Sequence, residues 1–147
     1  MHRVLRPGGS VGLITWGGIE HNSWMTCVGM AAMANGIVAG GPPTGPGGIF
    51  SLADPDELER LTAAPGFTDV IVTEVDVAFT AGSIDAHLDR VTSLAGPLAL
   101  ALRAAPPDQY AAFHRTATEL AAPYLTANGV EIPGVALLTT GRRSPAR

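Results

Sequence analysis

Aromatic and polar side chains follow the first apolar run of the chain within a few residues: Trp16, His21, Asn22 and Trp24. The run itself, Val11 to Trp16, has no polar alternation, which favours a β-strand covered on both faces. Ligands of open α/β sheets bind outside the carboxyl ends of strands. The four residues therefore predict the mouth of a small-molecule pocket, with Asn22 as hydrogen-bond donor or acceptor. The alternative is that the tryptophans only fill the space between sheet and helix.

Other kinds of chemistry have less support in the sequence. The histidines show neither H-x-x-x-H nor H-E-x-x-H spacing, so we predict no metal site. A G-x-S-x-G elbow is absent, so nucleophilic catalysis is not expected. His87 and His114 lie in a helical stretch, where a surface position is the default and a general-base role the alternative. For Asp85 we expect a capping role in the first turn of that stretch. No catalytic residue is assigned.

A glycine-rich segment, Gly45-Pro46-Gly47-Gly48, is the nearest match to a phosphate cradle. No strand precedes it, and Phe50 stands where a G-x-G-x-x-G pattern has its third glycine. We therefore assign no cofactor-binding residue to it and expect an irregular loop over residues 40–48.

The remaining elements follow from capping and periodicity. A helix from Trp24 to about Asn35 is expected, with Ser23 as its cap. The clearest helix begins at Asp54, with Pro55 in its first turn and Glu57 as capping-box partner. In that helix we expect Leu58 and Leu61 to face inward, Asp56 to pair with Arg60, and Gly66 to mark the end. Residues 83–125 are helical by pattern, and Pro123 ends the last of these helices.

Two further strands are predicted. Val70 to Phe79 alternates and has one polar face, which is typical of an edge strand. Val135 to Thr139 is continuously apolar, which indicates an interior strand although it comes last. We therefore predict that the last strand lies between the first two, antiparallel, after a turn at Asn128-Gly129. The first strand then lacks a partner on its far side, and such an edge invites pairing with a second copy or a partner chain.

Composition limits the class of protein. The 147 residues, 46% hydrophobic, suit a single domain, 1–147. A net charge of −4, with nine arginines and no lysine, argues against nucleic-acid binding. Cys27 is the single cysteine, and no apolar stretch is long enough to span a membrane. We expect a cytoplasmic protein without a membrane or nucleic-acid partner.

Several motifs in order resemble a known family over Val4 to Arg143. The motifs are Arg3-Val4-Leu5-Arg6-Pro7-Gly8-Gly9, Thr15-Trp16-Gly17, Asn22-Ser23-Trp24, Phe50-Ser51-Leu52-Ala53-Asp54-Pro55 and Gly66-Phe67-Thr68-Asp69-Val70. Together they resemble the C-terminal half of class I S-adenosylmethionine-dependent methyltransferases, in the small-molecule branch that includes quinone-biosynthesis enzymes. The resemblance implies a partial Rossmann-like α/β sheet of three strands with an inserted helical lid at about 83–125.

The same resemblance implies S-adenosylmethionine as cofactor of the family and places Trp16, His21, Asn22 and Trp24 at the acceptor pocket. The family's glycine-rich turn and its acidic ribose-binding residue have no counterpart in this sequence. We therefore expect the chain to carry the acceptor side and, alone, neither to bind the cofactor tightly nor to turn over. Two alternatives remain open: a truncated product of a longer enzyme, and a noncatalytic binding or assembly module that pairs through the edge of strand 11–16.

Overall fold

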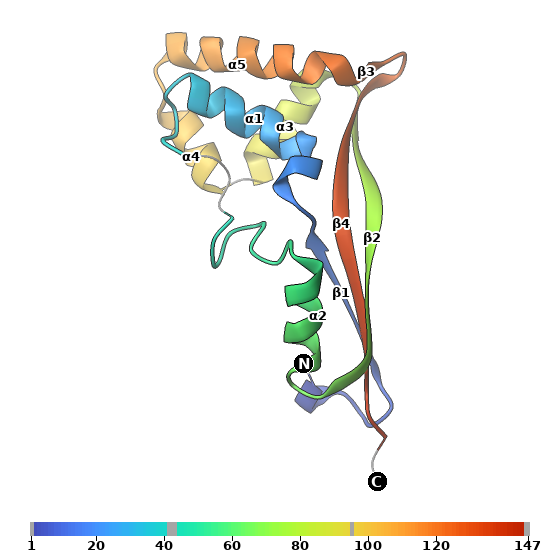
Figure 1. Cartoon of the computed structure of the whole chain (residues 1–147). Helices are drawn as coiled ribbons and strands as arrows, with labels where there is room; N and C mark the ends of the chain where they lie inside the picture. Colours follow the sequence, from blue (N-terminus) through green and yellow to red (C-terminus); the bar gives the residue numbers. More distant parts are fainter. Residues whose placement is uncertain (1, 41–43, 95, 146–147) are drawn as a thin grey trace. The chain divides into compact units, whose positions relative to one another are not determined.

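The computed structural model describes residues 2–40, 44–94 and 96–145 and combines helices with one β-sheet (Figure 1). The elements are η1 His2–Val4, β1 Ser10–Trp16, η2 Ile19–His21, α1 Ser23–Ala34, α2 Pro55–Ala63, β2 Phe67–Ala81, α3 Ile84–Leu94, α4 Gly96–Ala104, α5 Pro107–Ala121, η3 Ala122–Tyr124, β3 Leu125–Thr126 and β4 Gly129–Arg143. The chain divides into two compact units. The first comprises Met1–His21, Pro43–Val77 and Val135–Arg147, and the second Asn22–Pro42 and Ala78–Gly134.

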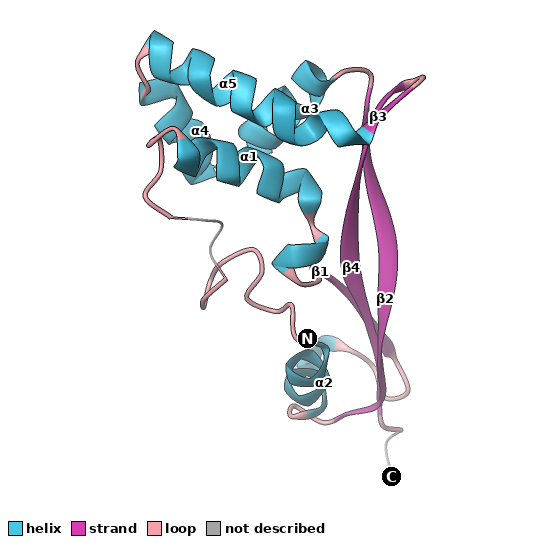
Figure 2. Cartoon of the chain, turned by 45° about the horizontal axis from the view of Figure 1, so that its top comes forward, coloured by secondary structure: helices cyan, strands magenta, loops and turns pink. Residues whose placement is uncertain are grey.

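The sheet has the predicted strand order. Strand β4 lies between β1 and β2, and the short strand β3 pairs with β4 as a fourth member (Figure 2). Strands β1 and β4 are antiparallel, with Leu13 opposite Thr139 and Ile14 opposite Leu138. The insertion of the last strand and its direction against the first are therefore confirmed, in a mixed α/β, mostly antiparallel open sheet.

The prediction that β1 is covered on both faces is wrong. Its residues alternate between exposed and half-buried, and Ile14 is 76% exposed. The covered face carries Thr15, whose hydroxyl donates to the Leu52 carbonyl in the segment before α2 (3.3 Å), and opposite it Leu137 is buried. On the other face of β1, Ser10, Gly12 and Ile14 are exposed. An apolar sequence shows that a strand is suited to pack against other apolar residues. Whether it does so depends on which elements lie over its two faces.

Strands β2 and β4 both extend beyond their predicted bounds. Strand β2 is an edge strand, as predicted, and Ile71, Thr73 and Val75 are exposed. Strand β4 begins at Gly129, where Val130 and Ile132 are buried and Glu131 and Pro133 are exposed. This alternation is typical of a strand. Pro133 and Gly134 disfavour a strand interior, so the sequence pattern placed the start of the strand after them, at Val135.

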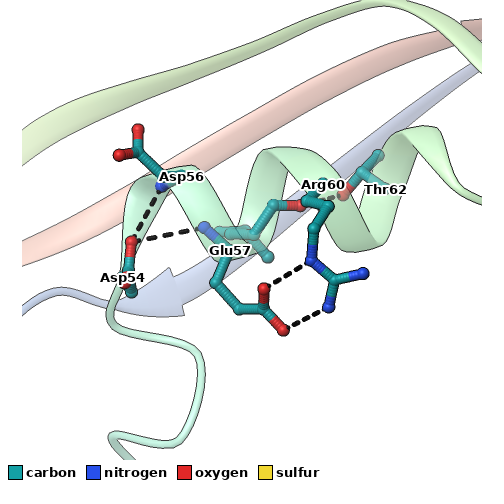
Figure 3. Close-up of polar contacts among 6 residues, drawn as sticks. Asp54, Asp56, Glu57, Arg60 and Thr62 are labelled. Carbon is teal, nitrogen blue, oxygen red and sulfur yellow. Dashed lines mark hydrogen bonds and ion pairs between the residues drawn. The ribbon is translucent and has the colours of Figure 1, made fainter.

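Helix α2 begins where the sequence predicted, but its side-chain contacts differ from the predicted ones (Figure 3). Asp54 Oδ1 accepts from the backbone N–H of Asp56 (2.9 Å) and of Glu57 (3.2 Å), which confirms the cap. Arg60 binds Glu57 through two hydrogen bonds of 2.7 and 2.6 Å, so the predicted pair with Asp56 is wrong. The Glu57 carboxylate contacts Arg60 rather than completing a capping box.

The buried face of α2 also differs from the prediction in one residue. Leu58 is buried as expected, whereas Leu61 is 42% exposed and Thr62 is buried in its place. The Thr62 hydroxyl donates to the Leu58 carbonyl (2.8 Å), which satisfies this polar group inside the helix. Gly66 follows with a φ of 99° and ends the segment as predicted.

The helices of the second unit form its core. Helix α1 begins after Asn22, not after Ser23, and the Asn22 side chain makes no capping bond. Phe113 and Ala117 of α5 are fully buried, as are Val28 and Ala31 of α1. Asn35 at the end of α1 donates to the Thr116 hydroxyl (3.1 Å), and Gln109 donates to the Asn35 carbonyl (2.7 Å), so polar bonds join α1 to α5. Helix α5 ends at Ala121, just before Pro123, as predicted. Ala95, within the stretch 83–125 that is predicted to be helical, lies outside the described residues.

Candidate functional site

Two of the four predicted site residues lie in the first unit. Trp16 is half-buried at the end of β1, opposite Ala136, and the next residue, Gly17, donates its N–H to the Val135 carbonyl (2.8 Å). This bond extends the β1–β4 ladder past Trp16 and fixes the backbone there. His21 is exposed in η2, and its Nε2 lies 3.5 Å from the Glu20 carboxylate. Both side chains have surface that a ligand can contact.

Asn22 and Trp24 belong to the second unit and are 0% and 4% exposed. The indole Nε1 of Trp24 donates to Asn22 Oδ1 (2.9 Å), and the Trp24 ring stacks on Phe79 with centroids 4.2 Å apart. A Cβ at Gly134 would lie 2.8 Å from the indole, so the ring packs against bare backbone there. Trp24 therefore has a packing role in its unit. The acceptor pocket, whose residues divide between the two units, stays a prediction.

His87 is fully buried, so its predicted surface position is wrong. Its Nε2 lies 3.0 Å from the Trp24 carbonyl, an acceptor only, so Nε2 carries the proton. Nδ1 is buried without a hydrogen-bond partner among the described residues. Burial lowers the pKa of His87, and the charge of Arg90 lowers it further, against an opposing effect of the bond to Trp24. We name Asn22, Trp24, Phe79 and His87 the Trp24 cluster.

The buried imidazole predicts acid sensitivity of the fold. The pKa of His87 in the folded chain lies below 6.5, its ordinary value in the unfolded chain. Once the pH falls below about 6.5, His87 is therefore protonated in the unfolded chain while it is still neutral in the folded chain. We expect the contribution of His87 to stability to be complete above that pH and to decline below it. Thermal unfolding at about pH 7.5 and about pH 5 should show a smaller loss in His87→Gln, which does not titrate, than in the wild type. Equal losses in both would contradict this origin of the pH dependence.

Asp85 differs from its predicted capping role, whereas the side chain of His114 is 40% exposed, in keeping with its predicted surface position. The cap of α3 is Ser83, whose hydroxyl oxygen accepts from the Ala86 N–H (3.1 Å). Asp85 instead lies 3.0 Å from His114 Nε2 and joins α3 to α5. The pair is largely exposed, which is typical of a weak structural contact.

A hollow of about 500 Å³ in the second unit adjoins the β3–β4 turn. Arg90 and Glu131 supply opposite charges to its lining, and Arg90 Nη1 donates to the Thr80 carbonyl (3.0 Å). None of the four predicted site residues lines it. Nothing in the sequence marked this hollow, because its lining residues come from segments far apart in the chain.

The glycine-rich segment lacks the strand–turn–helix context of a nucleoside-cofactor cradle. Residues 45–48 form bends and turns between α1 and α2, and none of residues 35–40 before them is in a strand. Residues 41–43 of the predicted irregular loop lie outside the described residues. Across residues 2–40, 44–94 and 96–145, no group of three or more potential metal-ligating side chains occurs. Among the described helices, none has the length and hydropathy that crossing a membrane requires.

No family model and no curated protein matches the chain.

Proposed function

We propose that this chain supplies the acceptor-binding part of a small-molecule methyltransferase that uses S-adenosylmethionine. The observation that carries the proposal is the sheet order β1-β4-β2 with β4 antiparallel to β1. This is the arrangement of the carboxyl-terminal strands that the motif resemblance implies. The order of the motifs between Val4 and Arg143 is the second support.

In this proposal the residues of the chain position the acceptor. Trp16 and His21 have exposed surface and make the direct contacts, whereas Asn22 and Trp24 are buried in the Trp24 cluster. In such enzymes the cofactor brings a methyl group that is already activated, so catalysis depends chiefly on alignment and exclusion of water. Orientation of this kind is worth up to about 7–11 kcal/mol.

The cofactor is expected to need residues beyond those described. Because residues 44–48 lack that strand–turn–helix context and the sequence has no other glycine-rich turn of this kind, we propose that the chain alone does not bind it tightly.

Two titrations of the purified chain test this function. Calorimetry with S-adenosylmethionine should give no binding heat, since this sequence has no counterpart of the family's glycine-rich turn or acidic ribose-binding residue. A panel of small phenols and hydroquinones should include a ligand that shifts the indole N–H resonance of Trp16 in an NMR titration. Trp16→Phe serves as the assignment control. Micromolar binding of the cofactor would contradict the half-site, and a panel without any binder would contradict the acceptor role.

The exposed edge of β1 favours a second candidate function, a noncatalytic assembly module. Among the described residues β1 has a single neighbouring strand, β4, and Ile14 is exposed beside that open edge. In this function the chain binds a partner strand and performs no reaction of its own.

A further inference from the structure

The open edge of β1 presents backbone groups that point outward at known positions. The hydrogen bonds from Gly17 N–H to the Val135 carbonyl and from Arg143 N–H to the Gly9 carbonyl lie at the two ends of β1 and show that its odd-numbered residues bond to β4. Hydrogen-bonded and non-bonded pairs alternate along an antiparallel ladder. The N–H and C=O groups of Gly12 and Ile14 therefore point away from β4, toward the open edge.

The two edges of the sheet differ in charge. Strand β2 exposes Asp69, Glu74 and Asp76, and charges of this kind discourage edge pairing. On β1 the opposite holds, because no charged residue occurs from Pro7 to Ile19. A second copy that approached β2 would meet like charges, whereas one that approached β1 would meet none. The edge of β1 therefore favours a copy of itself.

The side chains of β1 complement each other across a two-fold axis. If the axis passes beside Leu13, antiparallel pairing sets Ile14 opposite the partner's Gly12, and both pairs use the outward-pointing backbone groups. Ile14 is 76% exposed, and a Cβ at Gly12 would meet nothing within 4 Å. The space above each Gly12 therefore receives the Ile14 side chain of the other copy on the uncovered face of the sheet.

We propose that two copies of this chain pair through β1, antiparallel and centred on Leu13, to form one continuous sheet. Such an isologous contact is closed by its symmetry, so it yields a dimer and not a fibre. The inference specifies the partner of the second candidate function and does not depend on methyl transfer. If the chain proves to be monomeric, the expected results of the cofactor and acceptor titrations do not change. If those titrations give the opposite results, the expected dimer does not change.

Light scattering during size exclusion tests the pairing. We expect a molar mass of twice 15.1 kDa for the wild type, falling toward one chain on dilution. Ile14→Lys should give a monomer, because the two copies would bring lysines to one short edge. Ile71→Lys is the matched control, since Ile71 is 60% exposed on the other edge strand, and it should stay dimeric. A monomeric wild type, an open-ended aggregate, or a dimeric Ile14→Lys would overturn the proposal.

A disulfide measures the register. Across the proposed axis the two Leu13 residues form a non-hydrogen-bonded pair with Cα atoms about 4.5 Å apart, within reach of a disulfide. The two Gly12 residues would be diagonal, about 7–8 Å apart, and out of reach. Under mild oxidation Leu13→Cys should form a covalent dimer and Gly12→Cys should not, with the wild type, whose Cys27 is buried, as blank. The reverse result would overturn the pairing centred on Leu13.

Discussion

Replacement of Gly129 by alanine is expected to destabilise the protein by about 3–5 kcal/mol, a large part of the stability of a domain this size. Gly129 has a φ of 125°, a region that favours glycine, and it opens β4 at the β3–β4 turn. An alanine Cβ would lie 2.2 Å from the Ala81 carbonyl oxygen and 2.9 Å from the Gly82 backbone. Backbone atoms cannot rotate away as a side chain can, so the turn and residues 81–82 would have to separate.

Urea unfolding measures this loss. Gly45→Ala is the matched control, because a Cβ at Gly45 meets nothing within 4 Å, and it should change stability by no more than about 0.5 kcal/mol. If Gly129→Ala unfolds at the same urea concentration as Gly45→Ala, the close approach of the turn to Ala81 is not a constraint on the fold.

The sheet was largely predictable from the sequence because its strands differ in pattern. The continuous run Val135–Thr139 indicated an interior strand and the alternation after Val70 an edge strand, and together they determined the order. The pattern could not show that Ile14 lacks cover. Residue types report what a strand can contact, whereas exposure depends on which other segments lie over it.

The contacts of the histidines were not predictable, for a related reason. The helical pattern of residues 83–125 left a surface position as the default for His87, but buried and surface positions can be adjacent residues on such a helix. What satisfies the imidazole is the Trp24 carbonyl, 63 residues earlier in the chain. Periodicity carries no information about a bond of that separation. Likewise, Asp85 lies in the first turn of its helix, where a negative charge is favourable, and a capping role was therefore predicted. In the structure its side chain instead contacts His114 on another helix.

The predicted pocket residues separate into two kinds once their burial is known. Trp16 and His21 keep exposed surface, so the sequence argument for ligand contact still applies to them. Asn22 and Trp24 satisfy each other inside the second unit. An aromatic residue near a strand end is compatible with either role in the sequence, and only a measurement that separates stability from binding distinguishes them.

Trp24→Ala is the variant that makes this separation, and we expect it to cost about 3–5 kcal/mol. The change removes the ring stacked on Phe79 and leaves Asn22 Oδ1 without the indole donor. Trp24→Phe keeps a six-membered aromatic ring and removes the fused five-membered ring with its N–H, so it should cost less, about 1–3 kcal/mol. His21→Ala, at an exposed side chain, should stay within about 0.5 kcal/mol.

A packing role and a ligand-binding role of Trp24 predict different effects of these three variants on stability and on acceptor affinity. If Trp24 acts by packing, the loss of stability in urea is largest for Trp24→Ala, smaller for Trp24→Phe and smallest for His21→Ala. The folded fraction of both Trp24 variants then keeps the acceptor affinity of the wild type, whereas His21→Ala, at a proposed contact residue, lowers it. If Trp24→Ala unfolds at the wild-type urea concentration, the packing role is wrong. Trp24→Ala should also weaken the acid sensitivity that His87 confers. The variant keeps the backbone carbonyl that accepts from His87, but without the indole the Trp24 cluster is loosened and admits water to the imidazole.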